Sequence, residues 1–174
     1  MLPAVIDLEA SGFGRGSWPI EVGWVLGDGR RGCTLVAPPP HWTHWSEEAE
    51  HKHGIRRDIA ELYGRSVDAV AEWLNAELAG RTLYTDAWGF DVPWLDRLFD
   101  EAGCVPYFRL ESLRTLLDED EALHWQPTYR AVIAECAVER HRASSDAWLI
   151  QCTLCRLKGW RQPVCAGPLE RPLG

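Results

Sequence analysis

Two carboxylates close the first apolar run of the chain. The segment "AVIDLEA" places Asp7 and Glu9 two residues apart among alanine, valine, isoleucine and leucine. Because side chains alternate across a β-strand, both acids point to one face, and Ile6 and Leu8 point to the other. Acid pairs with this spacing also arise by chance, but like charges in an apolar setting are costly unless a cation or a proton compensates them. The pair therefore predicts a divalent-cation site near the end of a strand.

Three further groups can complete such a site. Asp91 in "WGFDVPWL" and Asp146 in "HRASSDAWLI" each fall at the start of an expected helix, and His141 precedes Asp146 by five residues. Each has an ordinary alternative, because an acid in a first helical turn also complements the helix dipole and a loop histidine needs no function. Hard cations prefer oxygen ligands, so the acids suit Mg²⁺. An imidazole with a pKa of about 6.5 suits a general base near pH 7.

The elements that must position these residues follow from the apolar pattern. Short apolar runs bounded by Gly, Pro and Asp predict strands at residues 3–9, 20–26 and 32–37, with a hairpin turn at residues 27–29. A polar connection to about residue 65 is expected to form a loop or short helices. Beyond it, apolar residues recur every three or four positions from Val67 to Leu78, which predicts an amphipathic helix.

The rest of the chain alternates between strand and helix signals. Strands are expected at residues 82–85 and near 107–110. Helices are expected over 95–102, near 113–117, near 132–136 and over 144–158, the last capped by Ser144 or Ser145. This order of elements indicates an α/β fold with a mixed sheet covered by helices on both faces.

Composition limits the class of protein. The chain has 174 residues, of which 46% are hydrophobic, which is enough for one domain over residues 1–160 with a Pro-rich tail over 161–174. A net charge of −8 argues against binding nucleic acid by bulk electrostatics, but acids at a metal site permit a nucleic-acid enzyme. The sequence has no long apolar span and no secretory leader, so a soluble cytoplasmic protein with free cysteines is expected.

Together, the segments "VIDLEASGFG", "FDVPWL" and "HRASSDA" resemble the three motifs of the DEDDh-type 3′-to-5′ exonucleases, the superfamily of proofreading exonucleases and RNase T. The resemblance covers about residues 3–158, and it extends to "HGI" at residues 53–55 and to the strand around residues 20–23. It implies an RNase H-like fold with a five-stranded mixed sheet. It also implies hydrolysis of phosphodiester bonds at 3′ ends of nucleic acid with release of nucleoside 5′-monophosphates.

The resemblance assigns roles to the five groups introduced above. Asp7 would bridge two Mg²⁺ ions, which Mn²⁺ can replace, and Glu9 and Asp146 would complete the shell of one of them. Asp91 would hold the second ion. His141 would act as the general base that takes a proton from the attacking water.

Substrate contacts are also implied. Ser11 and Phe13 occupy positions that contact the 3′-terminal nucleotides. Trp88 and Trp18 are further candidates for stacking on bases, although most tryptophans in a domain of this size belong to the core. Arg15, Arg140 or Arg142 can meet phosphates, or can equally be solvated surface charges. Many relatives carry His-Asn where this chain has Thr85 and Asp86, so Asp86 adds a negative charge near the predicted metals. The implied partner is the 3′ end of a single-stranded nucleic acid, either DNA or RNA, and no membrane is involved. Many relatives form homodimers, so a homodimer is a further expectation.

Two other interpretations compete with the enzyme. The first is a catalytically silent module of the same fold that binds nucleic acid or docks a partner. The second is a zinc site in "HWTHWSEEAEHKH", whose four histidines fit no common zinc-ligand spacing. Cys152 and Cys155 also have the spacing of a redox or zinc pair, but in a helix this spacing simply places two small apolar residues on one face.

Overall fold

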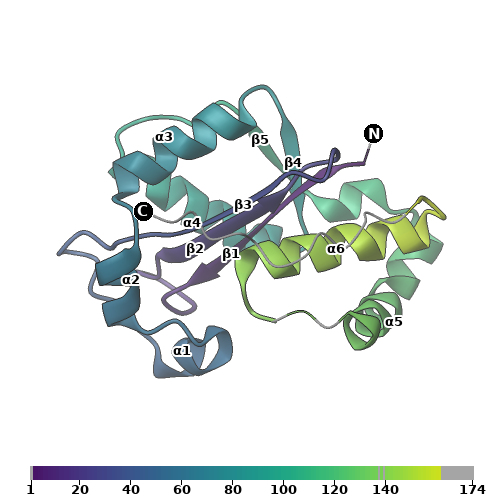
Figure 1. The fold of residues 1–174 in the computed structure, drawn as a ribbon, viewed down its shortest axis with the longest axis horizontal. Helices are drawn as coiled ribbons and strands as arrows, with labels where there is room; N and C mark the ends of the chain where they lie inside the picture. Colours follow the sequence, from purple (N-terminus) through teal and green to yellow (C-terminus); the bar gives the residue numbers. More distant parts are fainter. Residues whose placement is uncertain (1, 137, 139, 162–174) are drawn as a thin grey trace.

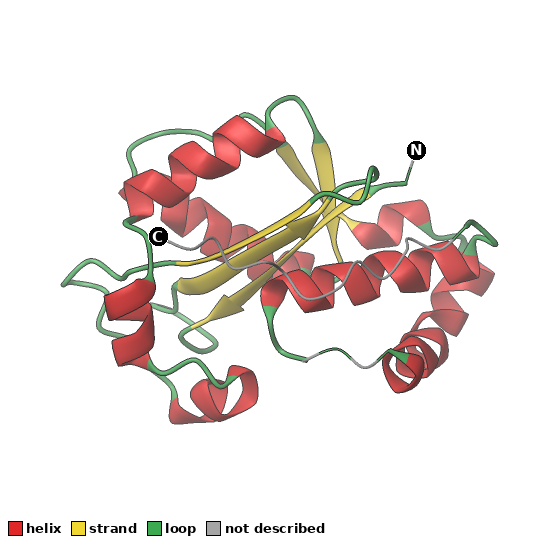
Figure 2. Cartoon of the chain, in the orientation of Figure 1, coloured by secondary structure: helices red, strands yellow, loops and turns green. Residues whose placement is uncertain are grey.

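The computed structural model describes residues 2–136, 138 and 140–161. Its strands form one five-stranded sheet in the order β3-β2-β1-β4-β5. Their bounds are β1 (Ala4–Ala10), β2 (Pro19–Val25), β3 (Arg31–Leu35), β4 (Thr82–Thr85) and β5 (Arg109–Ser112). β1, β2 and β3 pair antiparallel, whereas β4 pairs parallel with both β1 and β5, so the predicted mixed sheet is confirmed (Figure 2).

Helices cover both faces of this sheet. Their bounds are α1 (Glu47–His53), α2 (Arg57–Tyr63), α3 (Val67–Leu78), α4 (Trp88–Glu101), α5 (Glu119–Glu135) and α6 (Ala143–Leu157). α3 and α4 pack on one face, and α5 and α6 pack on the other (Figure 1). The polar connection after β3 forms the short helices α1 and α2.

The central strand β1 separates two apolar cores. Ile6 and Leu8 belong to the core under α3 and α4, whereas Val5 belongs to the core under α6. Because Asp7 and Glu9 alternate with Ile6 and Leu8, they lie on the same side of the sheet as α6. The predicted division of β1 into an apolar face and an acidic face is therefore confirmed.

Several predicted boundaries were wrong for physical reasons. The segment near 113–117 forms a 3₁₀ turn (Leu113–Leu116) instead of an α-helix. α5 begins at Glu119, well before the predicted apolar positions, because a capping box between Asp118 and Glu121 starts it on a polar surface. α4 likewise begins at Trp88, so Asp91 lies in its first turn as predicted. The predicted tail over 161–174 lies outside the described residues except for its first position.

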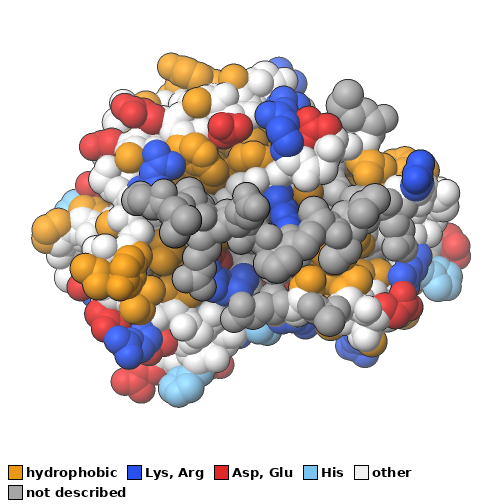
Figure 3. All heavy atoms as spheres, in the orientation of Figure 1, with side chains coloured by type: hydrophobic (Ala, Val, Ile, Leu, Met, Phe, Trp, Pro, Cys, Tyr) orange, Lys and Arg blue, Asp and Glu red, His pale blue; other side chains and the backbone are white. Residues whose placement is uncertain are grey.

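Surface charge, the cysteines and the length of the helices give three further facts. On the face drawn in Figure 3, the coloured acidic and basic side chains are interspersed instead of gathered in single-sign patches. The five cysteines among the described residues are free thiols, and Cys165 lies outside those residues. None of the helices in the described part of the chain has the length and apolar character needed to cross a bilayer.

Candidate active site

The acidic residues predicted from separate motifs meet at one end of the sheet. β1 and β4 are parallel, so their carboxyl ends lie at the same edge, where α4 begins and brings Asp91 beside the acids of β1. The first turn of α6 brings Asp146 to the same place from the other side. Ligand atoms of Glu9, His141 and Asp146 all lie within 4.8 Å of one another, which makes these three residues a possible metal site.

Electrostatics place Asp7 among the same residues. Burial raises the pKa of its carboxyl well above the usual value, and the charges of Asp91, Glu9, Asp146 and Asp86 raise it further. Such an effect requires all four acids to lie within a short range of Asp7. Asp7 is therefore the carboxylate that the other acids surround.

The pKa values of the neighbouring carboxyls are raised as well. Burial, followed by the charge of Asp146, raises the pKa of Glu9 to about 7. Burial is also the main reason that the pKa of Asp91 rises to about 8 and that the pKa of Asp146 rises above its usual value. Raised values of this kind mean that the ionised carboxylates are unfavourable in this site, first because of burial and then because of neighbouring acids for Glu9 and Asp91, and that a bound cation would stabilise them.

Asp91 is held by one neighbour and leaves one oxygen available. Its side chain is buried, and the Thr85 hydroxyl donates a hydrogen bond to Oδ2. Thr85 is itself oriented by the Ala87 N–H, which donates to its hydroxyl at 2.9 Å. The other oxygen, Oδ1, accepts no hydrogen bond within the described part of the chain. Thr85 stands where many relatives of the resembled family carry histidine, so the sequence motif gave no sign of this contact.

Asp146 is arranged in the same manner. Its Oδ2 accepts the backbone N–H of His141 at 3.0 Å, and its Oδ1 has no hydrogen-bond donor among the described residues, with Arg140 Nε at 3.7 Å. Buried carboxylate oxygens without donors are costly unless something else satisfies them. Oxygen ligands of this kind suit a hard divalent cation, so the residues present fit the predicted metal.

His141 combines an unusual backbone with an available imidazole. Its φ of 60° lies in the left-handed region, where non-glycine residues are uncommon. Nδ1 of the ring lies 4.0 Å from Asp146 Oδ2. Desolvation, followed by the charge of Arg140, lowers the pKa of the imidazole below its usual value. The ring is therefore mostly neutral at pH 7, which is the form that can accept a proton.

The predicted substrate residues separate into exposed and buried groups. Phe13 and Trp88 are 58% and 46% exposed, so their rings are accessible to bases. Trp18 is fully buried and packs against Trp42, so of its two expected alternatives, stacking on bases or a place in the core, the structure shows the core. Ser11 is also buried, and its backbone N–H donates to the Trp18 carbonyl at 2.9 Å. Ser11 thus fixes the loop that presents Phe13.

Phe13 borders an aromatic surface and a groove. Its ring lies edge-on to Phe90 at 5.4 Å and 6.2 Å from Trp94. Phe90 and Trp94, together with residues 14–17, line a groove of about 840 Å³. Arg15 also lines this groove, whereas Arg142 forms an ion pair with buried Glu21. Arg142 therefore has a structural partner, and its contact with phosphate stays a prediction.

Two charged residues flank the site. Asp86 is exposed, yet its pKa rises to about 6, chiefly by desolvation, with the charge of Asp146 adding to the shift. Lys52 was not predicted, because a lone lysine between two histidines carries no sequence signal. Its Nζ lies 5.9 Å from the Phe13 ring centroid, and its charge lowers the pKa of Glu9 against the effect of burial.

The four histidines considered for zinc have separate partners. His41 contacts Glu101, and His44 contacts the Ser11 hydroxyl. The ring of His51 lies against the Glu47 carbonyl, and His53 accepts from the Ile55 N–H. Cys152 and Cys155 are both buried in α6, in line with the structural interpretation of that pair.

Comparisons with known proteins were informative for the fold. No family profile and no curated protein sequence matches the chain. Solved structures of E. coli exonuclease I do match, among them the zinc-bound complex with single-stranded DNA, at 13% identity and a TM-score of 0.68 over 91% of this chain. The apo form matches at 15% identity with a TM-score of 0.68 over 94% of this chain.

The matched region is less than half of the exonuclease I chain. The chain spans 41% of the exonuclease I chain in the zinc-bound complex and 43% of it in the apo form. At such low identity the likeness concerns the fold. The chain has an α/β fold with a mixed five-stranded sheet, and this RNase H-like architecture is shared with exonuclease I.

The raised pKa values predict how pH and metal affect stability. Glu9, Asp86 and Asp91 hold protons in the folded protein up to about pH 7, 6 and 8, whereas their usual pKa values are 4.5 or 3.8. Between these limits the folded protein binds more protons than the unfolded chain, so the free energy of unfolding of the metal-free protein falls as pH rises. We expect Mg²⁺ to raise the melting temperature near pH 8 and to have little effect near pH 5, because protons compete with the cation.

Thermal unfolding with EDTA or with MgCl₂ across this pH range measures both effects. Asp7→Asn is the matched variant, because it removes the most surrounded charge and should flatten the pH dependence. An equal shift by Mg²⁺ at both pH values would contradict the expectation.

Proposed function

We propose that this chain is a divalent-cation-dependent 3′-to-5′ exonuclease that hydrolyses phosphodiester bonds at the 3′ end of nucleic acid and releases nucleoside 5′-monophosphates. The observation that carries the proposal is the meeting of Glu9, His141 and Asp146 within 4.8 Å, next to Asp7. Glu9 lies 132 positions before His141 and 137 positions before Asp146 in the sequence, so the fold alone brings the first motif and the third together. The fold shared with exonuclease I supports the same conclusion.

The acids would hold two Mg²⁺ or Mn²⁺ ions. Asp7, Glu9 and Asp146 would bind one of them, and Asp7 and Asp91 the other. When bound, such ions stabilise the negative charge that develops on the phosphoryl oxygens and make water more acidic. The Thr85 hydroxyl keeps one Asp91 oxygen engaged, so the unpartnered Oδ1 would be the oxygen available to hold a cation.

His141 would act as the general base. With Nδ1 turned toward Asp146, Nε2 is the nitrogen that accepts the proton of the attacking water. The oxygen of that water bonds to phosphorus as the bond to the 3′ oxygen of the preceding nucleotide breaks. The products are a nucleoside 5′-monophosphate and a strand that is one nucleotide shorter and ends in a 3′ hydroxyl.

The exposed aromatic residues favour a single-stranded substrate. Unpaired bases can stack on Phe13 and Trp88, at about 1–3 kcal/mol for each base. Ser11 supports the loop that carries Phe13, and the groove beside Phe90 is large enough for nucleosides. Asp86 places a negative charge near the phosphate path, so it is expected to weaken binding or to alter the preferred terminal nucleotide.

Incubation with end-labelled single strands tests the proposal. DNA and RNA oligonucleotides of matched sequence, labelled at the 5′ end, should shorten one nucleotide at a time in Mg²⁺ or Mn²⁺ and remain intact in EDTA. Circular single strands should remain intact because they have no 3′ end. Retarded migration of both nucleic acids without any shortening would favour a catalytically silent binding module of the same fold.

A further inference from the structure

The start of α6 lies directly against β2. A Cβ atom built on Gly23 would lie 2.1 Å from the Ser144 backbone nitrogen and 2.4 Å from the Ala143 carbonyl carbon. Both are backbone atoms, so a side chain at this position cannot be accommodated by a rotamer change. Glycine at position 23 therefore allows the first turn of α6 to touch the strand.

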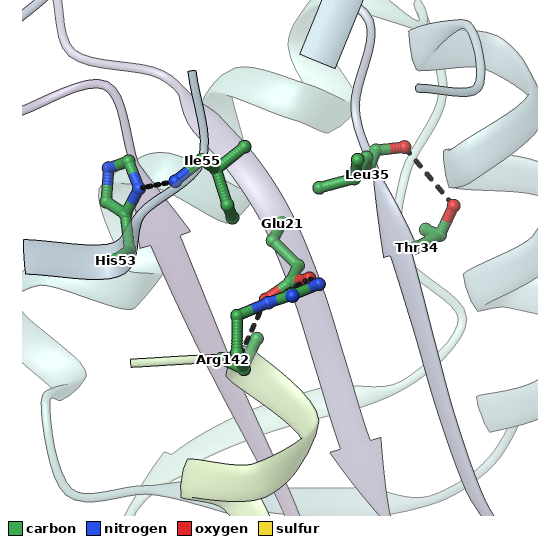
Figure 4. A network of polar contacts seen from close by, with 7 residues as sticks. Glu21, Thr34, Leu35, His53, Ile55 and Arg142 are labelled. Carbon is green, nitrogen blue, oxygen red and sulfur yellow. Dashed lines mark hydrogen bonds and ion pairs between the residues drawn. The ribbon is translucent and has the colours of Figure 1, made fainter. Parts of the chain in front are cut away.

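Two residues away on the same face of β2, Glu21 binds the same turn (Figure 4). Its side chain is 1% exposed. One oxygen, Oε2, accepts the Ala143 N–H at 2.8 Å, and the Arg142 guanidinium donates to the carboxylate through both Nε and NH2. The N-cap residue of α6, Arg142, makes no capping bond with its own side chain, so Glu21 satisfies an otherwise free helix-start donor from another element.

This contact corrects the predicted cap of the last helix. Ser144 and Ser145 were expected to cap it, but both lie inside α6, and the acceptor for its first N–H comes from β2. A sequence pattern can only indicate caps that are local in the chain. The cap in this protein is 122 residues away from its donor.

Strand register makes this docking relevant to the site. Across the antiparallel pair, Glu21 is the partner of Glu9, and Gly23 is the partner of Asp7. The two β2 residues that receive α6 thus stand beside the two acids of β1. Any shift of the first turn of α6 would move His141 and Asp146 relative to Glu9.

We propose that Glu21 is a positioning residue of this site: by holding the Ala143 N–H and the Arg142 guanidinium, it sets the distance of His141 and Asp146 from Glu9. Its kinetic consequence rests on the proposed function. Stability alone does not account for Glu21, because a buried acid opposite another acid is an unfavourable cross-strand pair, and apolar replacements of buried ion pairs are often at least as stable.

Glu21→Gln tests the proposal while keeping the side-chain shape. The amide oxygen can still accept from Ala143, but the charge that holds Arg142 is lost. We expect Mn²⁺ affinity, followed by the electron paramagnetic resonance signal of free Mn²⁺, to fall about tenfold to a hundredfold, as seen when groups that orient ligands are removed. The kcat should fall in the same range with little change in KM, and amide hydrogen exchange over residues 140–146 should accelerate.

Glu135→Gln is the matched control. It breaks another Arg–carboxylate pair, between Glu135 at the end of α5 and Arg156 in the last turn of α6, which is exposed and lies at the other end of α6. Because exposed ion pairs contribute little, this variant should keep its melting temperature, Mn²⁺ affinity and kcat. A purely structural role for Glu21 predicts a lower melting temperature in Glu21→Gln with unchanged Mn²⁺ affinity and kcat at temperatures well below melting. That result would overturn the proposal.

Two further measurements test the positioning role of Glu21 if the first variant fails to fold or the wild-type chain is inactive. If Glu21→Gln fails to fold, Arg142→Lys keeps the charge but loses the two-pronged contact, and it should lower Mn²⁺ affinity in the same direction by a smaller factor. If the wild-type chain cleaves no nucleic acid, the proposed function fails, and Mn²⁺ affinity with hydrogen exchange still tests the positioning role. Wild-type Mn²⁺ affinity in both Glu21→Gln and Arg142→Lys would overturn it.

Discussion

Asp7→Asn should reduce strand shortening by about a thousandfold or more, the largest loss expected from any single substitution in this chain. Asp7 is the acid on which the charges of Glu9, Asp86, Asp91 and Asp146 all act. Its replacement by an amide of the same shape removes the one carboxylate that both cations would share. The apparent KM for oligonucleotides should change little, because the lost interaction is with the developing charge of the transition state.

Asp68→Asn is the control for this variant. Asp68 is an exposed acid in the first turn of α3, which packs on the face of the sheet opposite α6. It should retain full activity. Single-turnover assays of both variants would measure the difference, and more than a tenth of wild-type activity in Asp7→Asn would contradict a bridging role.

His141→Asn should lower kcat by about 10²–10⁴-fold, the range that a general base contributes. Asparagine tolerates the left-handed backbone at this position, so the variant removes the imidazole without forcing the loop to move. Because the neutral ring accepts the proton and its pKa lies below the usual value, wild-type activity should rise with pH below about 6.5. At saturating Mg²⁺, the part of this acidic limb that belongs to the imidazole should disappear in the variant, and the part caused by protonation of the carboxylates should remain.

Metal affinity distinguishes a general base from a metal ligand at position 141. A ring nitrogen of His141 lies within 4.8 Å of carboxylate oxygens of Glu9 and Asp146, so the imidazole can also serve as a metal ligand. A general base predicts a lower kcat with unchanged Mn²⁺ affinity, whereas a ligand predicts weaker Mn²⁺ binding. His124→Asn, on the exposed surface of α5, is the control for loss of a histidine and should leave both quantities unchanged.

Much of the fold follows from local periodicity. The strand at residues 82–85 and the helix from Val67 to Leu78 coincide with β4 and α3, because each has a clear repeat of two or of three to four residues. The acidic face of β1 follows from the same alternation. The start of α5 was missed because its first two turns are polar and exposed, so they carry no apolar repeat.

The sequence likewise predicts only part of the candidate site. Asp7, Glu9, Asp91, His141 and Asp146 were recognisable because each lies in a short motif. The residues that hold them in place were not, since Thr85 and Glu21 act through contacts that depend on the assembled fold. Trp18 also needed the assembled fold: an aromatic residue near a substrate loop can stack on bases or belong to the core, and the packing against Trp42 shows that it is core.

The order in which the sheet and helices follow one another along the chain has a consequence during protein synthesis. The antiparallel strands β1 to β3 are adjacent in sequence and can pair early, but two of the five groups of the site arrive only with the loop before α6 and its first turn. A nascent chain in which α6 has not yet emerged from the ribosome should therefore not bind divalent cations tightly at this site.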